Sequence, residues 1–282
     1  MREISGPIFD VIRRTSMVFA TGFLAAFVIL HSFPAFADFS AGWRAYQQGD
    51  FATALKIWQP LADKGDARAQ LNLGVLYDEG RGVAQDANNA IKWWTLAAEN
   101  GNGEAQHNLG MMYLTGRGVP PDYKLAVKWL ERAALQGIGR SQYSLGKMHG
   151  EGLWVKKDQR QAFEWIKKAA QKGIYQAQYN LGKMYRDGAG VEKNHEAAAY
   201  WFLMAAQQGY AKAQNHIATR LVRGDGIKQD KIEALKWLIL ASKAGYDNAE
   251  HNRQILSRRM SVKEQEQAED LARKWKPQQA PQ

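Results

Sequence analysis

Apolar and polar residues alternate along most of this chain in a pattern that repeats every 36 residues. Each period holds two stripes of apolar residues at spacings of three and four, with glycines between the stripes and after the second. Such spacings place apolar side chains on one face of an α-helix. Two of the rows that recur in phase are the tryptophans Trp93, Trp129, Trp165, Trp201 and Trp237, and the glycines Gly80, Gly116, Gly152, Gly188 and Gly224. The pattern predicts tandem helix pairs that bury their stripes against one another, with the tryptophans in the core between repeats rather than on a stacking platform for sugars or bases.

The first full period shows why each unit forms two helices. Leu73 and Gly74 lie on the first apolar stripe, and the missing side chain of Gly74 lets the partner helix approach closely. The glycines of the loop at 80–83 tolerate positive φ. Asp86 lies at the N-cap of the second helix, where its carboxylate accepts from free backbone N–H groups. Gly101 then ends that helix.

The run Ala69–Val83, followed by Asp86, Ala90 and Trp93, resembles the Sel1-like repeat (SLR), an α/α solenoid related to the tetratricopeptide repeat. The resemblance extends over about residues 39–275. It implies an adaptor or scaffold that holds protein partners, in bacteria often in the cell envelope or in signalling. It implies no single activity and no cofactor.

The predicted fold is all-α: a right-handed α/α superhelical solenoid of about seven helix pairs with a C-terminal capping helix. Residues 38–66 form a tetratricopeptide-like first pair, and residues 67–246 form five full repeats. Residues 247–276 form C-terminal capping helices, in which Ser261–Glu264 is a capping box. Residues 277–282 are predicted to be a disordered tail.

Residues 1–37 resemble a signal peptide. Arg13 and Arg14 precede an uncharged stretch at 15–37, which ends in the small-x-small sequence Ala35-Phe36-Ala37. The protein is therefore predicted to be exported to the periplasm. Two alternatives stay open: secretion, or an uncleaved inner-membrane anchor, because the uncharged stretch is long enough to span a bilayer.

Composition narrows the function further. The formal net charge is +10, from 38 Lys and Arg against 28 Asp and Glu, which favours acidic partners. Export and mixed charges in every repeat disfavour nucleic acid. There is no cysteine, and the six histidines show no metal-ligand spacing, so we expect neither a thiolate site nor a metal site nor a cofactor.

One short motif matches an enzyme class. Ser144-Leu145-Gly146-Lys147 fits the Ser-x-x-Lys of penicillin-recognising enzymes. Ser144, however, occupies the repeat position of Asn72, Asn108 and Asn180, and no Ser-Asp-Asn or Lys-Thr-Gly triplet accompanies it. We interpret the match as coincidence and expect no catalysis, with a β-lactam- or peptidoglycan-active enzyme as the alternative hypothesis.

Binding is predicted on the first helix of each pair, which lines the concave surface in tetratricopeptide-type solenoids. Variable positions there make a basic, aromatic strip suited to carboxylates on a partner protein. The candidate binding residues are Arg44, Leu71, His107, Met111, Tyr143, Lys147, Tyr179, Lys183 and Arg186. The alternatives are a site for anionic cell-wall polymer and a solvated face without a partner.

The third inter-helix loop departs from the repeat, because Gly152 is followed by Leu153 and Trp154 where the other loops read Gly-x-Gly. Tryptophan lacks the freedom of glycine at positive φ, so we expect this loop to take another shape. Leu153 and Trp154 then either form an exposed apolar contact or fold back on the neighbouring loop.

Overall fold

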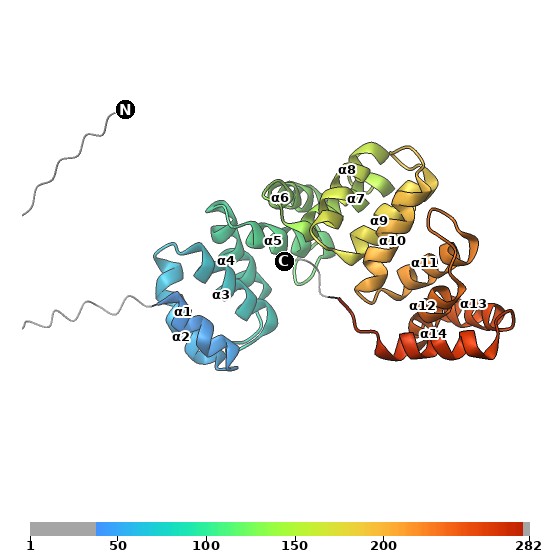
Figure 1. Cartoon of the computed structure of the whole chain (residues 1–282). Coiled ribbons are helices and arrows are strands. Elements are labelled where there is room, and N and C mark those ends of the chain that lie inside the picture. Colours follow the sequence, from blue (N-terminus) through green and yellow to red (C-terminus); the bar gives the residue numbers. More distant parts are fainter. Residues whose placement is uncertain (1–37, 279–282) are drawn as a thin grey trace, which may run out of the picture. The chain divides into compact units, whose positions relative to one another are not determined.

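The computed structural model describes residues 38–278, which fold into 14 α-helices without a strand among them (Figure 1). This confirms the predicted all-α fold. The predicted signal peptide at 1–37 and the last part of the predicted tail, 279–282, lie outside the described residues. No helix within 38–278 combines the length and the hydropathy that a membrane span requires.

The helices alternate between first and second members of each pair. In chain order they are α1 (Phe39–Gln47), α2 (Phe51–Asp63), α3 (Ala67–Glu79), α4 (Ala87–Glu99), α5 (Gly103–Thr115), α6 (Tyr123–Leu135), α7 (Gly139–Glu151), α8 (Gln159–Gln171), α9 (Tyr175–Asp187), α10 (His195–Gln207), α11 (Ala211–Arg223), α12 (Lys231–Lys243), α13 (Asp247–Ser257) and α14 (Val262–Lys274). From α1 to α13, each helix packs mainly against its neighbours in the chain, and α14 packs against α12. Contacts restricted to adjacent units define a solenoid.

Second helices begin at the residues that the sequence predicts. The Asp86 carboxylate accepts from the backbone N–H of Asn89 at 3.0 Å. The corresponding residues at the other second helices cap the first turn in the same way: Asp50, Asp122, Asp158, Asn194 and Asp230. Each cap satisfies donors that the helix start would otherwise leave free.

In five of the first helices, α1, α3, α5, α7 and α9, a glycine faces a large side chain of the second helix. A Cβ atom on Gly74 would lie 2.3 Å from the Trp94 ring, so the close helix approach predicted there is confirmed. The same pairing joins Gly42 to Trp58, Gly110 to Leu130, Gly146 to Ile166 and Gly182 to Phe202. This row of large residues was not predicted, although its members too are spaced by one repeat.

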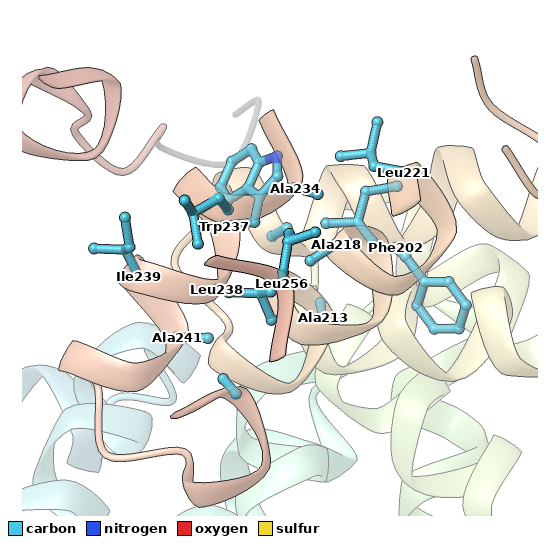
Figure 2. Packing of buried hydrophobic residues seen from close by; sticks show 14 of the residues in the cluster. Phe202, Ala213, Ala218, Leu221, Ala234, Trp237, Leu238, Ile239, Ala241 and Leu256 are labelled. Atoms are coloured by element: carbon cyan, nitrogen blue, oxygen red, sulfur yellow. The ribbon is translucent and has the colours of Figure 1, made fainter. Parts of the chain in front are cut away.

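The tryptophan row lies mostly in the core. Trp93, Trp129 and Trp237 are buried as predicted, whereas Trp165 and Trp201 are only half-buried. Trp93 and Trp129 each pack into a cluster built by the preceding helices. Figure 2 shows the corresponding cluster at the C-terminal end, where side chains from α10 to α13 meet: Phe202, Ala213, Leu221, Trp237, Leu238 and Leu256.

A row of buried glutamines ties successive repeats together. Gln70 Nε2 donates to the carbonyl oxygen of Ala62 at 3.0 Å, across the joint between α3 and α2. Gln106, Gln142, Gln178 and Gln214 donate in the same way to Ala98, Ala134, Ala170 and Ala206. Each of these carbonyls, at the end of a second helix, also accepts from the N–H of the glycine that follows, so the glutamine is its second donor.

The third loop corrects a prediction. Trp154 has φ 58°, close to the 69° of Gly82 at the equivalent position. The Asp158 N–H closes this loop onto the His149 carbonyl at 2.9 Å, as Asp86 does onto Tyr77. The expectation that tryptophan would force another loop shape is therefore wrong.

Aromatic stacking accounts for the tolerance of this residue. The Trp154 ring lies 4.1 Å from the Tyr123 ring at 15°, and Tyr123 opens α6 of the preceding repeat. Such a pair contributes about 0.5–1.5 kcal/mol. The left-handed conformation costs roughly 1–2 kcal/mol, so stacking offsets much of it. Trp154 folds back on its neighbour and is still 47% exposed, with Leu153 at 40%.

The C-terminal helices close the core. Ser261 and Glu264 form the predicted capping box at the start of α14. Beyond this helix the Trp275 ring meets Trp237 edge-on, with ring centroids 5.9 Å apart. The Gln278 N–H then donates to the Gln207 carbonyl at 2.8 Å, so the chain after α14 contacts the end of α10.

Candidate functional site

A groove on the third and fourth full repeats brings several predicted binding residues together. It has a volume of about 490 Å³ and lies between α7, α8, α9 and the start of α11. We call it the central groove. Tyr143 and Lys147 of α7 line it, as do Tyr179 and Lys183 of α9. Its other lining residues include Gly146, Gly150, Glu151, Ala162, Ile166, Gln176, Asn180, Met184, Asp187, Tyr210 and Lys212.

The tyrosines of the central groove are held by hydrogen bonds. The Tyr143 hydroxyl accepts from Asn180 Nδ2 at 3.2 Å, and the Tyr179 hydroxyl lies 3.2 Å from His216 Nε2. Tyr210 packs edge-on against Tyr179, with ring centroids 5.2 Å apart. Burial raises the pKa of Tyr143 and Tyr179, so both hydroxyls stay protonated at neutral pH. The rings are therefore positioned before any partner arrives.

His216 holds the Tyr179 hydroxyl through its Nε2 atom. Burial, together with the positive charges of Arg186, Arg220 and Lys183, lowers the pKa of His216 to about 4. The imidazole is therefore neutral at pH 7, and its Nε2 shares a hydrogen bond with the Tyr179 hydroxyl. Its ring stacks on Phe202 at 4.9 Å and 11°, which fixes the imidazole in the plane that meets Tyr179.

Charges in and beside the central groove are only partly compensated. Lys147 Nζ lies 3.8 Å from Glu151, and Arg186 binds both carboxylate oxygens of Asp187 at 2.7 Å. These bonds to Arg186 lower the pKa of Asp187. Within residues 38–278, no carboxylate oxygen lies within 4.0 Å of the ammonium of Lys183 or Lys212. Two positive charges thus face the groove without a counter-ion.

Leu71 and Met111 line a second groove, two repeats earlier. This N-terminal groove has a volume of about 350 Å³ and involves α3, α4, α5 and Arg140 of α7. Ion pairs cross it: Arg117 lies 2.5 Å from Asp78, and Arg140 pairs with Glu104. Its other lining residues include Asn72, Val75, Glu79, Trp94 and Asn108.

The remaining predicted residues lie apart from both grooves. His107 is only 7% exposed, and its Nδ1 lies 2.7 Å from Ser141 Oγ. Burial lowers the pKa of His107 to about 4, and little of its surface faces solvent. Arg44 is exposed on α1, 4.0 Å from Asp38. Arg186 lies beside the central groove, where it binds Asp187.

Ser144 has the contacts of an ordinary helix-surface serine. Its hydroxyl donates to the Arg140 carbonyl one turn earlier, at 3.0 Å. Lys147 points to Glu151 instead. In residues 38–278 no three His, Asp or Glu side chains converge as a metal site requires.

Most lining residues of the central groove were not predicted, among them Gly150, Tyr210 and Lys212. The repeat itself contains the signal for the first. Gly150 occupies the position of Asp78, Leu114, Arg186 and Val222, and it alone in that row has no side chain. Tyr210 and Lys212 lie at the start of α11, the first helix of the repeat that follows Tyr179 and Lys183. A search within single repeats therefore does not find them.

Comparisons with known proteins agree on the family. Five consecutive segments match the Sel1 repeat: residues 67–102, 103–138, 139–174, 176–210 and 211–246. Among solved structures, a protective antigen of uropathogenic Escherichia coli with an SLR fold is 30% identical, with a TM-score of 0.74 over 84% of this chain. The match covers 52% of the antigen, so this chain spans about half its length.

A Sel1 repeat protein from Oxalobacter formigenes is 31% identical, with a TM-score of 0.68. That match covers 73% of this chain and 85% of the Oxalobacter protein. No curated protein sequence matches the chain. With five matched repeats and two related structures of the same fold, the chain belongs to the Sel1 repeat family, whose solenoids are typically non-catalytic scaffolds for protein–protein interaction.

Proposed function

We propose that this protein is an exported, non-catalytic adaptor that holds a segment of a partner protein in the central groove, in cell-envelope organisation or signalling. The observation that carries the proposal is a pair of hydrogen-bonded tyrosines, Tyr143 and Tyr179, beside lysines without a counter-ion. Tyrosine often anchors protein interfaces. Side chains held in place before binding lose little entropy when the partner arrives, which favours affinity.

Export is supported by the sequence of residues 1–37, in which an uncharged stretch ends in Ala35-Phe36-Ala37. Sequencing of the mature amino terminus tests this part of the proposal. Cleavage leaves Asp38 as the first residue, whereas an uncleaved anchor retains Met1. In both cases the repeats face the periplasm, so the proposed partner is a periplasmic or envelope protein.

Photocrosslinking in intact producing cells tests the binding surface. A photoreactive residue replaces Gln176, which lines the central groove, and the same residue replaces Leu135, which is 76% exposed on α6, as the control. We expect a discrete adduct with the first probe only. The double variant Tyr143→Ala, Tyr179→Ala should abolish it.

Circular dichroism checks that the tyrosine variant keeps its helical content, since both side chains are only half-buried. An adduct of the same mass and yield in that variant would refute the central groove as the binding site. An equal yield of adducts from the probe at position 135 would show non-specific contact instead.

A further inference from the structure

We infer that the central groove selects an acidic segment with an apolar anchor: the apolar side chain lies over Gly150, and neighbouring carboxylates pair with Lys183 and Lys212. This inference rests on the proposed function, because it specifies the chemistry of the partner segment at the same groove. It combines three features of the groove: a hollow, two tyrosine walls and two unpaired ammonium groups.

The hollow follows from Gly150. A Cβ atom there would meet only the Ala162 methyl, at an ordinary 3.5 Å, and the backbone φ is not positive. By contrast, a Cβ atom on Gly146 would lie 2.6 Å from Ile166, so that glycine is required by packing. Helix packing and backbone conformation therefore do not explain Gly150. Its effect is to leave open the space that Leu114 or Arg186 fills in neighbouring repeats.

The surroundings of the hollow suit an apolar side chain. Ala162 lies next to Gly150, Ile166 and Met184 line the same groove, and all three side chains are buried. Tyr143 and Tyr179 provide the aromatic walls, with their hydroxyls already bonded to Asn180 and His216. An apolar residue in this space contacts carbon on several sides and leaves no polar group of the groove without its partner.

The lysines of the central groove indicate which residues flank the apolar side chain of the partner segment. In the N-terminal groove, Arg140 is neutralised by Glu104. In the central groove, Lys212 occupies the position of Arg140, and Gln176 occupies the position of Glu104. The positive charge is therefore kept, and the carboxylate that neutralises it is absent. Lys183 replaces Met111 and adds a second positive charge. Individual carboxylates complement these two lysines, whereas a continuous polyanion would also meet Glu151 and Asp187.

Selection from a displayed library tests the inference. The full chain is immobilised, exposed to random peptides of about a dozen residues, and the retained peptides are sequenced. We expect enrichment of peptides in which Asp or Glu flank a large apolar residue. On Gly150→Leu, which copies Leu114 of the second repeat, we expect about a tenfold loss of that enrichment.

Gly150→Leu separates binding from folding. The added Cβ has room, and leucine is a better helix former than glycine, so the thermal unfolding midpoint should not fall. A second variant, Lys183→Glu with Lys212→Glu, should remove the preference for acidic residues. Its matched control is Lys56→Glu with Lys64→Glu, the same charge change on exposed lysines of the first pair, which should keep the preference.

The outcomes are distinguishable. Peptides enriched on the native chain without carboxylates, or enriched equally on Gly150→Leu, overturn the inference and leave a peptide-binding groove as proposed. Acidic runs without an apolar residue overturn it in favour of a polyanion site. If no peptide is enriched on the native chain, both the inference and the proposed groove fail.

Discussion

The N-terminal and central grooves occupy equivalent places in the repeat but differ in chemistry. Leu71, Val75 and Met111 line the first, and two repeats later Tyr143, Lys147 and Lys183 line the second. The packing residues beneath them change far less in character, since Trp94 and Ile166 both fill the space opposite a glycine. Because the core fixes the backbone, residues on the surface of the first helices vary without altering the fold.

The grooves differ most in their ion pairs. Arg117 pairs with Asp78, and Arg140 pairs with Glu104, across the N-terminal groove. The corresponding residues of the central groove are Ala189 with Gly150, and Lys212 with Gln176. One pair is replaced by two small residues and the other loses its acid. The central groove is thus the one that keeps space and charge for another molecule.

The largest expected effect comes from the floor of the N-terminal groove. Trp94 is 2% exposed, and its Nε1 donates to the Leu71 carbonyl at 3.1 Å. Trp94→Ala should lower the free energy of unfolding by about 3–5 kcal/mol, because it leaves a cavity and removes the hydrogen bond to Leu71. Urea unfolding measures this. Leu135→Ala, on an exposed side chain, should stay within about 0.5 kcal/mol; equal effects would contradict the assignment of Trp94 to the core.

Much of this comparison follows from the sequence, because a repeat period fixes which residues share a position. The N-cap role of Asp86 and the close approach at Gly74 were predicted and are confirmed. The period also relates Tyr143 to Tyr179 one repeat later, and in the structure both line the central groove. Regular local geometry makes such predictions sound, since each repeat meets the same neighbours.

Features that depend on side-chain contacts between repeats were not predicted. The row that contains Tyr143 also contains His107, yet His107 is buried against Ser141 and lines neither groove. Trp154 keeps a glycine conformation because its ring stacks on Tyr123 of the preceding repeat. Such outcomes depend on which pair of residues meets, and periodicity alone does not specify the pair.

Two buried histidines, one in each region, should make the free energy of unfolding fall at acidic pH. His107 contacts α7 from α5, and His216 lies behind Tyr179; burial lowers the pKa of each to about 4 from 6.5. The unfolded chain therefore binds these protons more tightly, so stability is full above pH 6.5 and falls as the pH drops towards 4. The loss should reach about 3 kcal/mol per histidine at low pH.

His216→Asn removes the contribution of His216 to the pH dependence of stability. Asparagine should be tolerated there, because it occupies this position in three other repeats. The free energy of unfolding, measured in urea at pH 7 and pH 4, should differ less in the variant than in the native chain. Carboxylates also titrate in this range, but they do so in both proteins and cancel in the comparison. An unchanged pH dependence would show that His216 is protonated in the folded state.

The smallest expected effect is a gain of stability at the C-terminal end. In three full repeats the glutamine that bridges to the preceding helix is also a hydrogen-bond acceptor: Gln70 Oε1 from Asn100, Gln106 Oε1 from Gln136, and Gln178 Oε1 from Gln208. Gln214 Oε1 is buried without a partner, and the residue at the equivalent position is Ala244. A buried acceptor without a donor is destabilising.

Ala244→Gln supplies the missing donor and should raise the free energy of unfolding by about 1 kcal/mol, the usual net value of one hydrogen bond. Ala244→Glu is the matched control, because an ionised carboxylate has nearly the same shape but no proton to donate to Gln214. Urea unfolding at pH 7 should therefore rank glutamine above both alanine and glutamate. Equal stability of the glutamine and glutamate variants would mean that the gain comes from helix propensity or packing, and that the hydrogen bond seen in those three repeats is not what makes their joints complete.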